Sequence, residues 1–226
     1  MPSVEKHFDD IAVSYDGFKR KNWYYYSSLK TLARRFVPEN SRVLEVGTAT
    51  GDILASLKPA DGTGLDISGA MVAAARQKYA GRPELKFFKA SPEDFRADKP
   101  FDFLVMVDVV EHMEHPEKAV AGMAALAAPG TLVFVSMANP LWEPALLLLE
   151  KLGLKMPEGA HYRMSFKKLN AIFTSANFRL EKRGFQLLLP AHVPFVSALL
   201  NAVSEKIPFL NRLCLIEYML FIRTGQ

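Results

Sequence analysis

The stretch from Val43 to Leu57 constrains the fold more than any other part of this chain. An apolar run of strand length leads directly into a turn bracketed by Gly47 and Gly51, and a segment of helical composition follows. Glycine permits a tight turn with the backbone close to a ligand, and the start of a helix offers unpaired N–H groups. This strand–turn–helix unit predicts an α/β fold with a ligand-binding site at the turn.

Apolar runs of strand length recur along the chain and alternate with helical segments. The expected strands are residues 42–47, 62–66, 85–90, 101–107, 131–137, 178–185 and 213–221, and the helices between the first five are 52–57, 68–79 and 116–127. Ser68 is a suitable N-cap for the second of these helices. Apolar strands that alternate with helices indicate a parallel sheet covered on both faces, and such sheets bind ligands beyond the carboxyl ends of their strands.

Several segments lie outside this alternation. Two helices are expected before the first strand, one around Phe8–Tyr15 and one over residues 22–36. Insertions follow the fifth and sixth strands, at residues 139–165 and 187–204. The second insertion has no Asp, Glu, Lys or Arg, but its two prolines and its polar residues argue against a helix that spans a membrane.

The composition is that of a folded protein from a reducing compartment. Half of the 226 residues are apolar and 23% are charged, which excludes global disorder. Cys214 is the single cysteine, so the chain has no internal disulfide framework and no cysteine-rich zinc module. Acidic residues stand near the start, where a secretory signal needs an apolar run. We therefore expect a cytoplasmic chain.

Positive charge is concentrated in the last third of the chain. The net charge is +4, but from His161 onward nine Lys or Arg residues stand against three acids. A basic region of this size suits nucleic acid, anionic lipid or an acidic substrate, and it equally suits an ordinary solvated face. Charge alone leaves these alternatives open.

Acidic residues stand at the ends of the expected strands. Glu45 lies just inside the end of the first strand and suits a cationic group such as an ammonium. Asp66 ends the second strand, nineteen positions after Gly47, and can accept both hydroxyls of a ribose. The fourth strand is followed by Asp108, Glu111 and His112, which we expect at the mouth of the site.

The glycine turn departs from that of a dinucleotide-binding protein. Ala49 and Asp52 stand where the second and third glycines of that motif belong. An acid at the helix start is also unfavourable beside a pyrophosphate. These positions disfavour an NAD-dependent reductase.

Four motifs, in this order and spacing, resemble those of the class I S-adenosylmethionine-dependent methyltransferases. They are Glu45-Val-Gly-Thr-Ala-Thr-Gly, Gly64-Leu-Asp-Ile-Ser, Phe101-Asp-Phe-Leu-Val with Asp108-Val-Val-Glu-His, and Pro129-Gly-Thr-Leu-Val. The resemblance implies S-adenosylmethionine as cofactor and a Rossmann-like α/β fold, with a seven-stranded, mostly parallel sheet, helices on both faces and an antiparallel member in the last strand pair. It also implies a single domain over residues 1–226, with a helical lid (1–40), a cofactor-binding half (41–138) and a substrate-side half (139–226).

The resemblance assigns residues to parts of the cofactor. By position in the motifs, Glu45 and Gly47 would face the methionine moiety, and Thr48 and Gly51 would form the turn. Asp66 would bind the ribose, and Ile67 and Met71 would flank the adenine. Ser91 and Glu93 would belong to the loop at the edge of the adenine, and Asp108 would complete the site. Three positions depart from the family pattern: Ala49 and Asn177 replace usual glycines, and Ser91 replaces an Asp that accepts from the adenine amino group. Pro92, next to Ser91, has no N–H to offer.

Two histidines are candidates for a catalytic base. Transfer to a hydroxyl or phenol requires a group that takes the proton, and histidine titrates near neutral pH. His112 and His161 are these candidates, and the alternative for each is a supporting or surface position. Asp108, Glu111 and His112 also resemble a stretch that binds a divalent ion in ubiquinone-pathway O-methyltransferases, but the same Glu-His occurs widely in the family without a metal. We assign no metal ligand.

The insertions bear on the acceptor. They are rich in leucine and stand beside the basic last third of the chain, which suits a small apolar or amphipathic acceptor, contact with an anionic membrane surface, or closure of the core or of a dimer interface. A nucleic-acid methyltransferase is the alternative enzyme, disfavoured because no RNA-binding module or stacking platform is visible. A non-catalytic binding or scaffold protein is the third hypothesis, and it is supported only by the altered loop at Ser91. The oligomeric state is left open.

Overall fold

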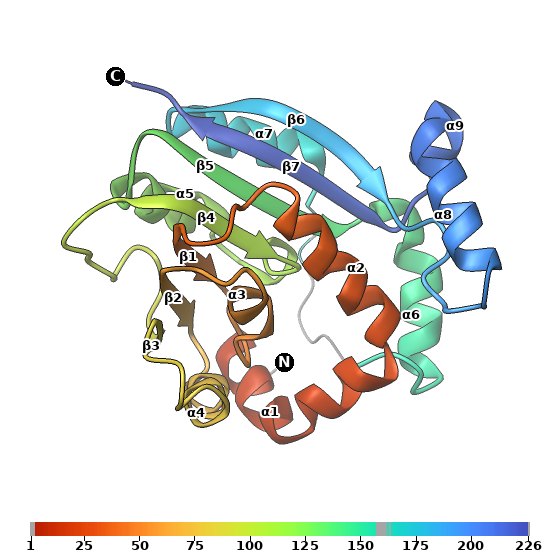
Figure 1. Cartoon of the computed structure of the whole chain (residues 1–226), viewed down its shortest axis with the longest axis horizontal. Helices are drawn as coiled ribbons and strands as arrows, with labels where there is room; N and C mark the ends of the chain where they lie inside the picture. The colour runs from red at the N-terminus through yellow and green to blue at the C-terminus, as the bar shows by residue number, and fades with distance from the viewer. Residues whose placement is uncertain (1–2, 157–161, 163, 226) are drawn as a thin grey trace.

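The computed structural model describes residues 3–156, 162 and 164–225, and a seven-stranded sheet runs through its centre (Figure 1). The strands are β1 (Arg42–Val46), β2 (Asp61–Asp66), β3 (Leu85–Lys89), β4 (Phe101–Val107), β5 (Ala127–Ala138), β6 (Phe178–Gln186) and β7 (Ile216–Arg223). Their order in the sheet is β3-β2-β1-β4-β5-β7-β6. Only β7 is antiparallel to its neighbours, β5 and β6. The predicted fold class is therefore confirmed, including the antiparallel member in the last strand pair.

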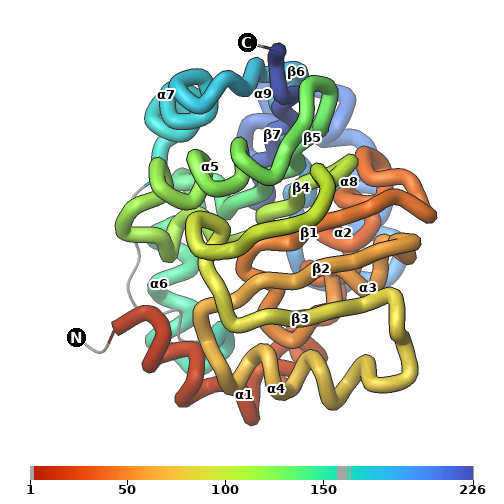
Figure 2. The backbone as a smooth tube through the Cα atoms, turned by 90° about the vertical axis from the view of Figure 1, so that its left-hand side faces the viewer, coloured from red at the N-terminus to blue at the C-terminus, as the bar shows by residue number. Residues whose placement is uncertain are grey.

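Helices cover both faces of the sheet because successive strand residues point to opposite faces. The helices are α1 (Val4–Lys21), α2 (Trp23–Arg34), α3 (Asp52–Ser56), α4 (Gly69–Lys78), α5 (Pro116–Ala125), α6 (Glu143–Lys151), α7 (Phe166–Ser175), α8 (Val196–Lys206) and α9 (Pro208–Asn211), with short 3₁₀ turns η1 (Val110–His112) and η2 (Pro140–Trp142). In β1, Leu44 packs in a core with α5 and α7, whereas Val43 packs in a second core with α2, α3 and α4. Figure 2 shows α5 and α7 on one side of the strands and α2 and α3 on the other.

The sequence signals for element boundaries are largely accurate where local capping decides them. Ser68 caps α4, its side chain accepting a hydrogen bond from the Met71 N–H as predicted. The first helix is longer than the predicted Phe8–Tyr15, because Ser3 caps it and it continues to Lys21. The last strand begins at Ile216 rather than at Leu213, because the chain there is still closing α9: the N–H of Cys214 bonds to the carbonyl of Asn211.

The strand order predicts a crevice at the carboxyl ends of the parallel strands. The chain winds outward from β1 to β2 and β3 in one direction, and from β4 to β5 in the other. A ligand-binding crevice is expected beyond the carboxyl ends of the two strands between which the winding reverses, here β1 and β4. In Figure 1, α6, α8 and α9 lie together on the side of the molecule toward which the parallel strands point. Within the described part of the chain, no helix is long and apolar enough to cross a membrane.

Candidate functional site

A cavity of about 1130 Å³ lies beyond the carboxyl ends of β1, β2 and β4. Its wall includes the last residues of these strands and those just after them, from Glu45 to Ala49, from Leu65 to Ile67 and from Val107 to Val109, together with side chains from α1, α2 and α6. Sites for a single small molecule usually measure about 300–1,000 Å³. The volume therefore leaves room for two ligands side by side.

The turn after β1 accepts no side chain at its first glycine. Gly47 has φ +72°, and a Cβ atom there would stand 2.2 Å from Cγ2 of Val109. The N–H groups of Gly47 and Thr48 both bond to the carbonyl of Leu65, which ties the turn to the end of β2. The backbone of the turn is thereby fixed against β2, and at Gly47 no Cβ stands between it and the cavity.

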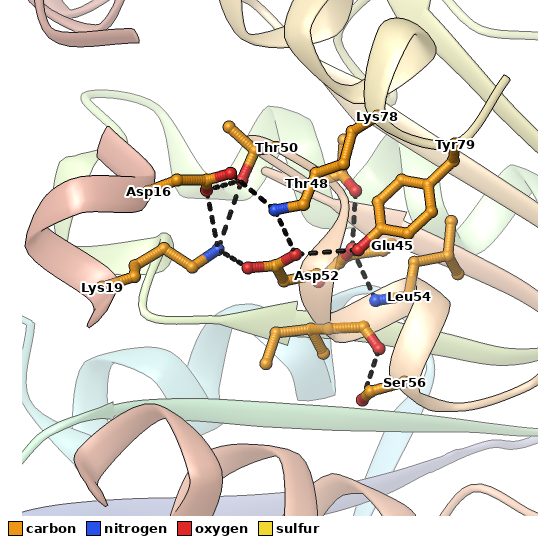
Figure 3. Close-up of polar contacts among 11 residues, drawn as sticks. Asp16, Lys19, Glu45, Thr48, Thr50, Asp52, Leu54, Ser56, Lys78 and Tyr79 are labelled. Carbon is orange, nitrogen blue, oxygen red and sulfur yellow. Dashed lines mark hydrogen bonds and ion pairs between the residues drawn. The ribbon is translucent and has the colours of Figure 1, made fainter. Parts of the chain in front are cut away.

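Glu45 is buried beneath this turn. Its Oε2 accepts hydrogen bonds from the Thr48 hydroxyl (2.6 Å) and from the Leu54 N–H (3.2 Å), as Figure 3 shows. Burial raises the pKa of Glu45 to about 8, although both hydrogen bonds oppose the shift. Burial therefore favours the protonated form of this carboxyl group. A cationic group placed beside it would favour the ionised form.

Asp66 joins the ends of β1 and β2. Its Oδ2 accepts a hydrogen bond from the Ala49 N–H (2.8 Å), and its Oδ1 accepts one from the Ser68 N–H (2.9 Å). The first bond holds Ala49 at φ +46°, a conformation that a residue with a side chain rarely adopts. Burial raises the pKa of Asp66, and the backbone hydrogen bonds oppose this shift. Each oxygen of the carboxylate keeps acceptor capacity for a ligand.

Asp108 joins the lid helices to the sheet. Its Oδ2 accepts a hydrogen bond from the Tyr25 hydroxyl (2.6 Å) on α2, and its Oδ1 accepts one from the Ser136 hydroxyl (3.2 Å) on β5. Burial, together with the negative charge of Asp108, raises the pKa of Tyr25 well above its usual value. Asp108 has φ +50°, and strain of this kind costs about 1–3 kcal/mol and is concentrated at functional sites.

A network of ion pairs fastens α1 beside the turn (Figure 3). Lys19 on α1 contacts Asp52, the first residue of α3, at 2.7 Å, and Lys78 on α4 contacts both Asp52 and Asp16 at 2.6 Å. The Tyr79 hydroxyl donates a further hydrogen bond to Asp52 (2.8 Å). Burial alone would raise the pKa of Asp52, but the two ammonium groups and the phenol lower it below its usual range. Asp52 is therefore ionised and holds three separate helices together.

Aliphatic side chains line the part of the cavity formed by later segments of the chain, where Lys155 also lies. They belong to Leu146, Leu149, Leu154, Met156, Pro190 and Leu215. Leu146 and Leu149 lie on α6, and Leu154 and Met156 follow it. Pro190 follows β6, and Leu215 directly precedes β7. The cavity thus has one end rich in buried acids, the polar end, and another built mainly from aliphatic side chains, the apolar end.

The structure brings most of the predicted site residues onto one wall. These are Glu45, Gly47, Thr48, Asp66, Ile67, Ser91, Glu93, Asp108, Glu111 and His112. Gly51 and Met71 are not on the wall: Gly51 starts α3 with φ +80° and faces Phe87, and Met71 is completely buried. His112 is buried and its ring stands edge-on to Phe8 at 5.4 Å. His161 lies outside the described residues.

Other wall residues were not assigned to the site from the sequence. Tyr15 and Lys19, one helical turn apart on α1, both line the cavity. Burial of the Tyr15 hydroxyl, together with its acidic neighbours, raises its pKa well above the usual value. The spacing of the two residues is the one signal that could have pointed to them, since it places both on the same face of a helix. In the described part of the chain, no three His, Cys, Asp or Glu side chains are grouped so as to hold a metal ion.

Comparison with protein families gives a match to a methyltransferase domain over residues 19–183. Among curated proteins, the chain is 30% identical over 133 residues to a ubiquinone biosynthesis O-methyltransferase from Aromatoleum aromaticum, over 55% of this chain and 57% of that protein. It is 28% identical over 166 residues to the protein of the same description from Xanthomonas axonopodis pv. citri, over 68% of this chain and 69% of that protein. The match thus spans less than two thirds of the length of the first relative.

Solved structures show the same fold across nearly the whole chain. A SAM-dependent methyltransferase from Thermotoga maritima has a TM-score of 0.75 at 18% identity, with 98% of this chain and 100% of that chain covered. The N-methyltransferase NodS from Bradyrhizobium japonicum, in complex with S-adenosyl-L-homocysteine, has a TM-score of 0.69 at 14% identity, with 99% and 100% covered.

Proposed function

The chain belongs to the class I S-adenosylmethionine-dependent methyltransferase family, and we propose that it methylates a small, apolar or amphipathic acceptor held in the same cavity as the cofactor. The observation that carries this proposal is the division of the cavity. One end has buried acids around a glycine turn, and the other end has aliphatic side chains. A charged nucleoside and an apolar molecule would each find the surroundings that suit them.

We assign the polar end of the cavity to the cofactor. In this proposal the backbone at Gly47 approaches the methionine moiety, because a side chain there would collide with Val109. Glu45 receives the ammonium group. Asp66 accepts hydrogen bonds from the ribose hydroxyls through lone pairs that its bonds to backbone N–H groups leave unused. The remaining predicted contacts are assigned to Thr48, Gly51, Ile67, Met71, Ser91, Glu93 and Asp108, of which Gly51 and Met71 would act through the shape of the turn and the packing behind the adenine.

The protein would contribute to the reaction mainly by positioning the two reactants and by excluding water. The bound cofactor supplies a methyl group on a positively charged sulfur, and transfer requires the acceptor atom, methyl carbon and sulfur in line at near-attack distance. Helices α1 and α2, within the proposed lid of residues 1–40, place Tyr15 and Tyr25 over the site. Their ion pairs and the hydrogen bond from Tyr25 to Asp108 would hold the lid closed during transfer.

A hydroxyl acceptor would need a base, and we assign that role to His112. As the acceptor oxygen bonds to the methyl carbon and the carbon–sulfur bond breaks, the acceptor proton passes to an imidazole nitrogen. His112 follows β4 and lines the cavity. His161 remains the second candidate from the sequence.

Phenols with an apolar side chain are the acceptors to test first. Two relatives are described as O-methyltransferases of ubiquinone biosynthesis, which favours transfer to oxygen in this chain as well. The aliphatic end of the cavity favours an acceptor with an alkyl or prenyl tail. We place the acceptor within the substrate-side half, residues 139–226, and the cofactor within residues 41–138.

The test combines binding and turnover. Calorimetry should show binding of S-adenosylmethionine, and donor labelled in its methyl group should label phenols at rates that rise with the length of the alkyl tail. His112→Gln should lower kcat for a phenol while leaving the affinity for S-adenosyl-L-homocysteine unchanged. Labelling of RNA instead of phenols would favour the nucleic-acid enzyme, and absence of cofactor binding up to millimolar concentration would favour a non-catalytic scaffold.

A further inference from the structure

Helix α8 is packed with its polar side inward. Ser197, Asn201 and Ser204 are buried, whereas Leu199, Leu200 and Val203 are exposed. An ordinary surface helix has the reverse arrangement, with its apolar stripe against the core. The leucines of α8 therefore face away from the protein, and core packing does not explain this arrangement.

Hydrogen bonds fix this orientation. The Asn201 side chain accepts from the Leu189 N–H (2.8 Å) and donates to the Tyr24 hydroxyl (3.1 Å) on α2. The Ser197 hydroxyl accepts from the Val193 N–H (2.7 Å) and donates to the Ala191 carbonyl (2.6 Å). Rolling the helix to bury its leucines would break these bonds and leave their donors and acceptors unsatisfied. The outward leucines are thus a built feature of the fold.

The exposed apolar side chains are concentrated in two segments. Apart from Val13, Trp23, Ile67 and Phe88, every exposed large apolar side chain of the described residues lies within residues 141–154 or 193–213. We call these two segments the apolar rim. Helix α6, which belongs to it, has no buried residue at all. Phe195 and Phe209 project furthest, with 93% and 72% of their surface exposed. Patches of this kind mark sites of contact with a partner or a membrane.

One segment of the apolar rim borders the cavity, and the other segment begins close to it. Leu146, Leu149 and Leu154 belong both to the rim segment around α6 and to the cavity wall, and Ala191, just before the other rim segment, also lines the cavity. Figure 1 shows α6, α8 and α9 on the same side of the molecule, and Figure 2 shows α6 and α8 on opposite sides of the sheet. Both segments of the rim therefore lie near the cavity.

Charge differs between the two rim segments. Residues 141–154 hold Glu143, Glu150 and Lys151, whereas the charge of residues 193–213 favours an anionic partner. Between residues 187 and 213 the carboxylate of Glu205 is the single acidic side chain, and it is paired with Arg35 at 3.5 Å. Lys206 and Arg212 are exposed in the same stretch, and neither makes an ion pair with a described carboxylate. Aliphatic and aromatic side chains bordered by Lys and Arg are the composition of surfaces that lie on anionic bilayers.

We propose that residues 193–213 of the apolar rim dock this protein on the surface of an anionic lipid bilayer. Phe195, Phe209 and the outward leucines of α8 enter the boundary between head groups and acyl chains, and Lys206 and Arg212 contact the lipid phosphates. Docking in this way opens the apolar end of the cavity toward the bilayer. The route by which an amphipathic acceptor then enters from the lipid rests on the proposed function, whereas the docking itself does not.

Vesicle co-sedimentation of the full chain tests the docking. The protein should sediment with vesicles of phosphatidylcholine that contain phosphatidylglycerol, more as the phosphatidylglycerol fraction rises, and less as salt is added. The double variant Leu199→Gln with Phe209→Gln should partition at least about tenfold less. Both residues are exposed, so the fold should be retained, as an unchanged melting temperature would verify. Val13→Gln, on α1 and outside the rim, is the matched control and should sediment like the wild type, since Val13 is 99% exposed.

Removing the cations should isolate the electrostatic part. Lys206→Gln and Arg212→Gln should each weaken binding to phosphatidylglycerol vesicles about fivefold, with no effect on the weaker binding to phosphatidylcholine alone. Absence of sedimentation at every phosphatidylglycerol fraction would overturn the proposal. It would be overturned as well if light scattering showed a dimer that the double variant converts to a monomer without any vesicle binding, because the rim would then be a protein interface. Calorimetry with S-adenosyl-L-homocysteine in the absence of lipid tests the proposed function separately.

Discussion

The polar end of the cavity and the apolar rim differ in how their side chains are satisfied. At the polar end, Glu45, Asp66 and Asp108 each have two hydrogen-bond partners within the chain, and the turn at Gly47 is closed by two backbone bonds. At the rim, the polar groups of α8 are satisfied inside the protein, while the leucines and phenylalanines remain largely exposed.

This difference indicates two kinds of preparation for binding. The polar end is organised before its ligand arrives, so the free-energy cost of ordering side chains on binding is small there. The rim keeps apolar surface in water, which is unfavourable until another apolar surface covers it. Substitutions at the polar end should therefore have large effects on affinity or stability, and single substitutions on the rim should have small effects on stability.

The largest effect is expected from Gly47→Arg. The new side chain would start 2.2 Å from Val109 and fill the turn, so binding of S-adenosyl-L-homocysteine should be lost in calorimetry. Gly130→Arg is the matched control, because Gly130 also has positive φ (+93°) but has open space around it, and it should bind normally. Normal affinity in Gly47→Arg would show that the cofactor does not use this turn.

Glu45→Gln should raise stability, and the gain should depend on pH. The pKa of Glu45 in the folded protein, about 8, is above its value of 4.5 in the unfolded chain. The folded state therefore binds more protons between these values, and the wild type loses stability as pH rises, by up to about 1.4 kcal/mol per pH unit. Denaturant unfolding from pH 5 to pH 8 should show this decline in the wild type, reduced in the variant, with a difference on the order of a few kcal/mol at pH 8. Parallel curves would mean that Glu45 is already ionised at neutral pH.

Asp66→Ala should weaken binding of S-adenosyl-L-homocysteine by about 1–3 kcal/mol, because charge-assisted hydrogen bonds to the ribose would be lost. Asp9→Ala is a close control. Asp9 likewise accepts two hydrogen bonds near the start of α4, from the Ser68 hydroxyl and the Ala70 N–H, but it does not line the cavity. Calorimetry should therefore show reduced affinity only for the Asp66 variant, and equal losses in both would assign the effect to the loop rather than to the ribose.

The smallest effect is expected on the rim. Leu148→Gln, at an exposed position of α6, should change the free energy of unfolding by no more than about 0.5 kcal/mol, as surface substitutions do. Leu54→Ala, at a completely buried position of α3, should cost about 2–5 kcal/mol. Denaturant titration of both variants would check this contrast. A large loss in Leu148→Gln would show that α6 packs against something that the exposed fractions do not reveal.

Much of the fold and of the polar end could be predicted because short-range signals encode them. The apolar run before Gly47, the cap at Ser68 and the acids that end β1 and β2 depend on neighbours within a few residues. Their outcomes match the prediction closely, and the strand order then brings Glu45, Asp66 and Asp108 to one cavity. Met71 differs: the family resemblance implies a place beside the adenine, but the side chain is completely buried and does not line the cavity.

Other features could not be predicted because they join residues that are remote in the sequence. The hydrogen bond from Tyr25 to Asp108 spans 83 positions, and the ion pair between Lys19 and Asp52 links α1 to the turn. Before folding, each of these residues is only one of many of its type, and no local pattern selects its partner. The bond from Asn201 to Tyr24, across 177 positions, is the extreme case.

The sequence by itself determined the order of strands and helices, the glycine turn and the kind of residue at each strand end, because backbone conformation and burial are set by periodicity and by local capping. The tertiary structure alone decided which side of α8 faces outward. An amphipathic pattern states only that one side of a helix differs from the other, and here the hydrogen bonds of Asn201 and Ser197 to distant backbone made the polar side the inner one. Whether leucines form a core or a surface depends on such partners, and folding must bring them together first.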